Sequence, residues 1–61
     1  MANMNKKEFH VLIVTRYKDG SSAVHNYVHA AENRRAIFDY FLKRFDPEEI
    51  ETLTILEERE A

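Results

Sequence analysis

His25 and His29 have the i, i+4 spacing that holds a metal ion when both residues lie on a helix. Their segment alternates like a strand, however, and on a strand these positions lie roughly 13 Å apart. In one register of the sheet, His10 and His29 would be cross-strand neighbours and make the better metal pair, but no carboxylate is placed to complete the site. We therefore expect no metal and no cofactor, and we interpret the histidines as part of a partly buried surface.

Serine and carboxylate side chains do not make a better case for catalysis. Ser21 and Ser22 follow Asp19-Gly20, where small polar residues are typical of a turn. The adjacent carboxylates at Glu48-Glu49 and Glu57-Glu58 have basic neighbours and are typical of solvated faces. The chain has no cysteine, one glycine and one proline, which excludes thiolate chemistry and a glycine-rich phosphate loop. We therefore expect no enzymatic activity.

The elements that position these residues begin with a hairpin. Residues 8–18 alternate with a period of two, Asp19-Gly20 is a strong hairpin signal, and a second strand runs from about residue 23 to 29. A loop of two or four residues would put Val24 and Val28 on the same face as Val11 and Ile13. A three-residue loop with a bulge would reverse that pairing. We favour the even loop, because it gathers the smaller apolar residues onto one core face.

The pattern then changes to a helical period of 3.6 residues. Asn33 can cap a helix that runs to about residue 45, and Asp46-Pro47 ends it. The apolar arc of this helix is about 200° wide, twice the roughly 100° stripe that one sheet face needs. Its central stripe is Ile37, Phe41 and Phe45, which Phe38 and Leu42 extend on one side and Tyr40 on the other.

A third strand, from residue 50 to about 57, completes a β-β-α-β chain. A right-handed crossover through the helix places this strand beside the first and antiparallel to it. The expected fold is α+β, a three-stranded antiparallel sheet of order 2-1-3 with one helix on one face. Residues 1–7 are expected to form a flexible arm and residues 8–58 a single domain.

The sheet face away from the helix favours assembly. In the expected register it leaves Leu12, Val14 and Tyr27 facing water, with His25 and His29 beside them. A 61-residue domain without disulfides has a small core and gains stability from association. We therefore expect a homodimer, formed either face to face through these apolar residues or by edge pairing plus helix contact through the surplus apolar arc, to which Tyr40 belongs.

The charges are placed unevenly. Residues 1–45 carry eight basic and four acidic side chains, a balance of +4, whereas residues 46–61 carry seven acidic side chains and one arginine, a balance of −6. An acidic end can repel nucleic acid or imitate its phosphates. We therefore do not expect direct nucleic-acid binding. The alternative is a small nucleic-acid-binding or regulatory protein that uses a basic stripe on the first strand, made of Lys6, Lys7, Arg16 and Lys18.

Location follows from two absences in the sequence. The longest apolar run covers residues 11–14, too short to span a membrane or to form the core of a signal peptide. The lack of cysteine suits a reducing cytoplasm. We expect a cytoplasmic protein with no membrane partner.

One ordered arrangement is more specific than a generic β-β-α-β chain. It comprises the strand at residues 11–15, Asp19-Gly20, a strand with Tyr27 and a closing His29, Phe38-Asp39 in mid-helix, Leu42, the run at residues 47–50, and Leu53. It resembles the short phage-encoded uracil-DNA glycosylase inhibitors, which are homodimers of β-β-α-β protomers. The resemblance covers residues 9 to about 57, and its most specific element is Phe38-Asp39.

The resemblance implies that the chain occludes the DNA-binding cleft of a host DNA-processing enzyme, most specifically uracil-DNA glycosylase, in the cytoplasm of the host cell. Phe38 matches the aromatic side chain that fills a pocket in the enzyme, and Asp39 matches its acidic neighbour. Leu42 stands where the family carries a second aromatic residue, so that contact is weakened. The helix is more basic than a DNA mimic requires, so DNA mimicry would come from Glu48, Glu49 and the acidic C-terminal end. The basic residues of the helix are Arg34, Arg35, Lys43 and Arg44.

Overall fold

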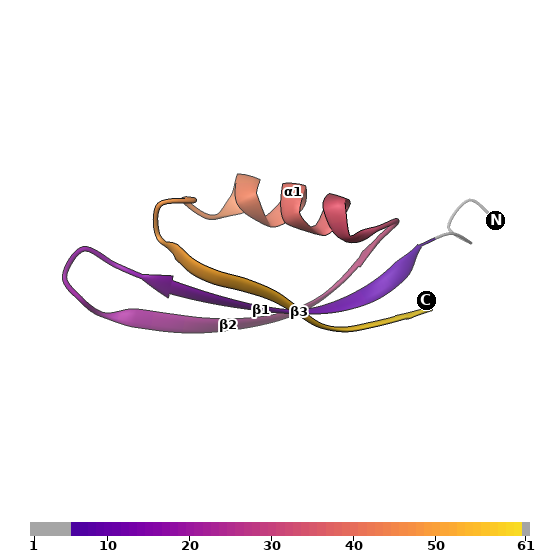
Figure 1. The fold of residues 1–61 in the computed structure, drawn as a ribbon, viewed down its shortest axis with the longest axis horizontal. Helices are drawn as coiled ribbons and strands as arrows, with labels where there is room; N and C mark the ends of the chain where they lie inside the picture. Colours follow the sequence, from indigo (N-terminus) through magenta and orange to yellow (C-terminus); the bar gives the residue numbers. More distant parts are fainter. Residues whose placement is uncertain (1–5, 61) are drawn as a thin grey trace.

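The computed structural model of the chain describes residues 6–60 and has the order strand, strand, helix, strand. The elements are β1 (Lys7–Arg16), β2 (Ser22–Ala31), α1 (Arg34–Arg44) and β3 (Ile50–Glu60). The three strands are antiparallel in the order β2-β1-β3, and α1 lies along one face of the curved sheet (Figure 1). The predicted fold class and strand order are confirmed.

The ends of the domain differ slightly from the prediction. β1 begins at Lys7 rather than after it, and β3 continues to Glu60 instead of ending near residue 57. Lys7 pairs with Glu60, so both ends of the described chain lie at the same end of the sheet. Residues 1–5 of the predicted flexible arm lie outside the described residues.

The hairpin register is the main correction to the prediction. The backbone N–H of Tyr17 donates to the carbonyl of Ser21 at 2.8 Å, which leaves a three-residue loop of Lys18, Asp19 and Gly20. Gly20 adopts a φ of 91°, which L-residues with a side chain rarely adopt. The Asp19 carboxylate accepts hydrogen bonds from the N–H of Ser21 at 2.9 Å and from its hydroxyl at 2.6 Å. The loop has an odd number of residues, so the prediction of a loop of two or four residues is wrong.

The odd loop reverses the faces of β2. Val14 pairs with Val24, and His10 pairs with Val28. Val24 and Val28 therefore lie on the sheet face opposite the helix, where they are 63% and 65% exposed. Tyr27 pairs with the buried Val11, and therefore lies on the helix side of the sheet. His25 and His29, which pair with Ile13 and Phe9, lie there too.

The predicted set of residues on the sheet face away from the helix is therefore partly wrong. Leu12 and Val14 lie on the face opposite the helix, as expected, but Tyr27, His25 and His29 do not. We call this face the open sheet face, because no other element within residues 6–60 covers it. The larger apolar side chains that β1 and β2 place on this face are Leu12, Val14, Val24 and Val28.

The core lies between the helix side of β1 and the buried stripe of α1. Phe9, Val11 and Ile13 have no exposed surface, and they pack with Ile37 and Phe41 from the helix. Thr15 is also buried, and its hydroxyl donates to the Tyr17 hydroxyl at 3.0 Å. From β3, Ile50, Leu53 and Ile55 pack against the edge of this core.

Local signals at both ends of α1 agree with the prediction. The Asn33 side chain accepts from the N–H of Ala36 at 2.9 Å, which satisfies one of the free donors of the first turn. Lys43 and Arg44 lie in the last turn, where the helix dipole favours positive charge. After Pro47, the Asp46 carboxylate accepts from the N–H of Glu48 at 3.0 Å and holds the turn into β3.

Truncating the buried stripe of the helix tests this core. Ile37→Ala should lower the free energy of unfolding by about 2–5 kcal/mol, because it opens a cavity against fully buried β1 side chains. Leu42→Ala, on the same helix but 43% exposed, is the matched control and should cost about 1 kcal/mol or less. Urea unfolding followed by circular dichroism measures both, and equal losses would contradict the core described above.

Candidate functional site

The residues predicted to bind a partner through the helix lie on its outer surface. Phe38 and Leu42, one turn apart on the same side of α1, are 38% and 43% exposed. Asp39 is exposed beside them. Ile37 and Phe41 carry the buried stripe of the helix, and Phe38 is not part of the core. We call Phe38, Asp39 and Leu42 the helix ridge.

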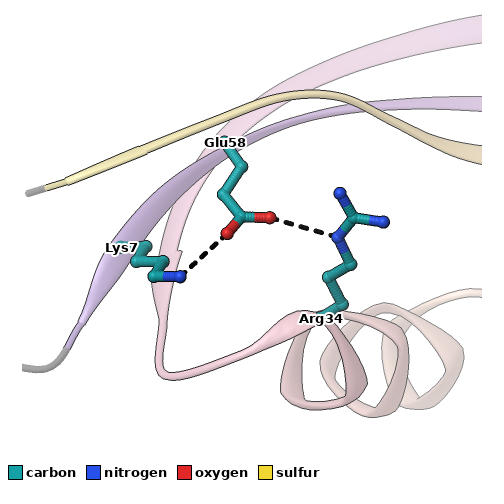
Figure 2. A network of polar contacts seen from close by, with 3 residues as sticks. All are labelled: Lys7, Arg34 and Glu58. Atoms are coloured by element: carbon teal, nitrogen blue, oxygen red, sulfur yellow. Dashed lines mark hydrogen bonds and ion pairs between the residues drawn. The ribbon is translucent and has the colours of Figure 1, made fainter.

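The start of α1 is attached to both β1 and β3 by one carboxylate. Glu58 accepts a hydrogen bond from Nζ of Lys7 at 2.9 Å and another from Nε of Arg34 at 3.1 Å (Figure 2). These two bonds, Lys7 first, lower the pKa of Glu58. The same bond with Glu58 raises the pKa of Lys7. The network therefore orients the first turn of the helix that carries the ridge.

The predicted acidic residues Glu48 and Glu49 lie in a different part of the molecule. They are in the turn after α1, where the Glu49 carbonyl accepts from the N–H of Arg16 at 2.8 Å. A hollow of about 530 Å³ there is formed by the hairpin end, this turn and the start of β3. Its lining residues are Arg16, Tyr17, Lys18, Asp46, Glu48, Glu49, Ile50 and Glu51. The residues of the helix ridge do not line this hollow, so the two glutamates and the ridge belong to different surface features.

An aromatic cluster between β2 and α1 was not predicted. Its rings are His25, Tyr27, His29, Tyr40, Phe41 and Phe45. His29 stacks on Tyr40 with ring centroids 3.9 Å apart, and Tyr27 lies 5.1 Å from Phe41. The guanidinium carbon of Arg44 lies 4.3 Å from the centroid of the Tyr40 ring. The sequence signal for this cluster was the ring at every second position, 25, 27 and 29. These rings face the helix only if the hairpin loop has an odd number of residues.

The cluster includes two residues assigned to other roles by the sequence. Tyr27 and Tyr40, which the sequence predicts at a dimer interface, both belong to the ring cluster within one protomer. A pocket of about 300 Å³ lies between β2 and α1 at this point. Its lining residues are Tyr27, Val28, His29, Tyr40, Phe41, Arg44 and Phe45.

His25, His29 and Ser21 take part in contacts within the fold. His10 lies on the open sheet face and His29 on the helix side, so the sheet separates the predicted better metal pair. Nε2 of His25 lies 3.2 Å from the Thr15 hydroxyl. Within residues 6–60, no group of three or more histidine, aspartate or glutamate side chains could hold a metal ion. The Ser21 hydroxyl donates to Asp19 in the hairpin loop.

The basic residues of β1 do not form one stripe. Lys7 points to the helix side, where it pairs with Glu58. Arg16 is at the other end of the strand and on the other face, and its guanidinium pairs with Glu51 at 3.1 Å. Two of the four residues of the predicted basic stripe therefore lie on opposite faces of the sheet, and each is paired with a glutamate.

Comparisons with known proteins add no relative. No family model matches the chain, and no curated protein or solved structure matches it. Across residues 6–60, no helix has the length and apolar character needed to cross a membrane.

The Glu58 network predicts a pH dependence of stability. A carboxylate with a lowered folded pKa stabilises the fold above its unfolded pKa, near 4.3, and this contribution is lost as the pH falls through the folded value. Thermal unfolding between pH 7 and pH 3 should therefore lose less stability in Glu58→Gln than in the parent chain. Part of the loss should remain, because hydrogen bonds from Ser21 also lower the pKa of Asp19.

Glu32→Gln is the control for this measurement, since it removes an exposed carboxylate from the loop before α1. Between pH 7 and pH 3 this variant should lose as much stability as the parent chain. If Glu58→Gln lost as much stability between pH 7 and pH 3 as the parent chain, the role of the network would be contradicted. Lys7, with a raised pKa, contributes below its unfolded value and loses that contribution as the pH rises through the folded one.

Proposed function

We propose that the chain is a non-catalytic inhibitor that binds the DNA-binding cleft of a host DNA-processing enzyme, most specifically uracil-DNA glycosylase. The observation that carries the proposal is Phe38, a large aromatic ring in mid-helix that is 38% exposed and lies outside the core. The resemblance of Phe38-Asp39 to the phage-encoded inhibitors supplies the target. Inhibition is steric, and the inhibitor performs no chemistry.

The helix ridge has the composition of a small protein-binding surface. An aromatic anchor that becomes desolvated in a partner's pocket carries much of the binding energy at protein interfaces. Leu42 adds apolar contact one turn away, and both side chains are already partly exposed. Asp39 places a carboxylate next to the anchor, where it can occupy the position of a DNA phosphate.

The acidic turn is proposed to contribute through the long-range field of the protein. Glu48 and Glu49 lie at the end of the molecule that also carries Asp46 and Glu51. Arg16 and Lys18 line the same hollow and reduce the local negative charge. We therefore assign this region to the steering of association with a basic DNA-binding cleft, and the ridge to the close contact.

The proposed inhibitor is a homodimer in the cytoplasm of the host cell. The open sheet face exposes Val24 and Val28 beside the partly exposed Leu12 and Val14. An apolar patch of this kind on a small domain without disulfides favours association.

Removal of the anchor ring tests the proposed contact. Phe38→Ala should leave a folded protein but weaken inhibition of uracil excision by about 30-fold or more, which corresponds to the loss of about 2 kcal/mol or more expected for a desolvated anchor. A uracil-excision assay with purified glycosylase measures inhibition, and a thermal melt measures folding. Asp39→Ala should cause a smaller loss, because a charge at the rim contributes less.

Leu56→Ala is the matched control, since Leu56 is also a large exposed apolar residue but lies on β3. It should inhibit like the parent chain. A folded Phe38→Ala protein with full inhibition would refute the assignment of the anchor. An absence of inhibition by the parent chain would refute the proposed function itself.

The steering role of the acidic turn predicts a salt-dependent association rate. Glu48→Gln combined with Glu49→Gln should slow association with the glycosylase more than it speeds dissociation, and the difference should shrink as added salt screens the charges. Surface plasmon resonance at several salt concentrations measures both rates. Glu32→Gln combined with Glu60→Gln removes the same charge from the opposite end and should change association less.

A further inference from the structure

The two edge strands of the sheet differ in their protection against pairing. β2, from Ser22 to Ala31, contains no lysine, arginine, aspartate, glutamate or proline. β3 carries Glu51, Glu57, Glu58, Arg59 and Glu60, and its register with β1 shifts at two places. Charges and bulges are the usual means by which an edge strand avoids pairing with another chain. β3 has both, and β2 has neither.

The hydrogen bonds at the hairpin end identify the backbone groups that β2 leaves free. The N–H of Tyr17 bonds to Ser21 of the hairpin, whereas the N–H of Arg16 bonds to Glu49, toward β3. Because this direction alternates along an antiparallel strand, the odd-numbered residues of β1 and β2 bond to each other. The even-numbered residues of β2 therefore direct N–H and C=O away from β1. These residues are Ser22, Val24, Asn26, Val28 and Ala30.

This free edge is complementary to a second copy of itself. If two β2 strands meet antiparallel with Asn26 opposite Asn26, Val24 of one copy lies opposite Val28 of the other. All the outward-facing groups of the strand are then paired, in about ten backbone hydrogen bonds. The two valines are already 63% and 65% exposed, so the pairing buries apolar surface on the open sheet face without repacking the core.

We propose that two copies of the chain pair β2 to β2 with Asn26 on the two-fold axis, and so form one continuous six-stranded sheet. This inference rests on the homodimer of the proposed function, but it does not depend on the target. An uncharged edge suits this symmetric contact, because no charges have to be matched across the axis and the usual protection of an edge strand is absent. In the sheet formed within residues 6–60, the other edge is β3, which carries four glutamates and does not meet this condition.

The aromatic cluster agrees with the same arrangement. Both helices lie on the same face of the six-stranded sheet, and the pocket between β2 and α1 is on the side of each helix next to the new contact. His25 of one copy is placed beside Tyr27 of the other, which extends the ring cluster across the axis. Tyr40 and Arg44, which line the pocket, lie on the side of α1 that faces the second helix.

Backbone pairing can be tested by removing one donor. Asn26→Pro removes an N–H that points away from β1, and proline is tolerated on an edge strand at such positions. Sedimentation at micromolar concentration should give twice the chain mass of 7.3 kDa for the parent and for Asn26→Ala, which keeps the N–H. For Asn26→Pro the apparent mass should fall by half. Circular dichroism checks that this variant keeps its strands.

Cysteine crosslinking tests the register even if Asn26→Pro does not fold. Residues 6–60 contain no cysteine, and neither does the rest of the sequence. Across the proposed axis the two Cα atoms of residue 26 lie about 5.5 Å apart, within the range of a disulfide. The two Cα atoms of residue 24 lie roughly 13 Å apart, beyond that range. Under mild oxidation, Asn26→Cys should link at least about tenfold faster than Val24→Cys.

Three results would overturn the proposal. They are a parent chain of monomer mass, a folded Asn26→Pro protein that keeps the dimer mass, and Val24→Cys linking as fast as Asn26→Cys. Thr54→Lys places a charge on the open sheet face opposite Leu12 and away from β2, so a dimer packed face to face would dissociate. Under the proposed pairing it should remain a dimer. A dimer with this register that fails to inhibit uracil excision would refute the proposed function and leave this inference intact.

Discussion

Side chains on a strand alternate between its two faces, so the number of residues in the β1–β2 loop decides which half of β2 meets the helix. Here the loop is Lys18, Asp19 and Gly20, closed by the bond from Tyr17 to Ser21. The Asp19 carboxylate holds Ser21 through two hydrogen bonds, and Gly20 supplies the positive φ. One residue more or fewer would exchange every side chain of β2 between the core side and the open sheet face.

The surfaces available to partners follow from this parity. Tyr27, His25 and His29 lie on the helix side and contact Phe41 and Phe45 with their rings. Phe38, which is not part of the core, is partly exposed on α1. Val24 and Val28, displaced to the open sheet face, become exposed beside the free edge. The proposed target contact and the proposed dimer contact therefore lie on different surfaces, and a dimer can present two helix ridges.

The distribution of charge also depends on tertiary contacts. As a sequence, the first 45 residues are basic and the last 16 are acidic. In the fold, β3 lies beside β1, so Glu58 meets Lys7 and Arg34, and Glu51 meets Arg16. These pairs are partly exposed and contribute modestly to stability. They also place a glutamate beside a basic side chain at each end of β1, while Glu48 in the turn after α1 is exposed.

The sequence by itself determined the elements, their order and the sheet topology, because these depend on local causes. Alternation, the Asp19-Gly20 turn, the Asn33 cap and the Pro47 stop each act within a few residues, and crossover handedness then leaves one strand order. Register and faces were decided only by the tertiary structure. β2 has apolar residues at both parities, valines at 24 and 28 and rings at 25, 27 and 29, so its pattern allows either face to turn inward. The rings face the helix because the odd loop and the packing against Phe41 and Phe45 act together, and that combination exists only when β2 and α1 are in place.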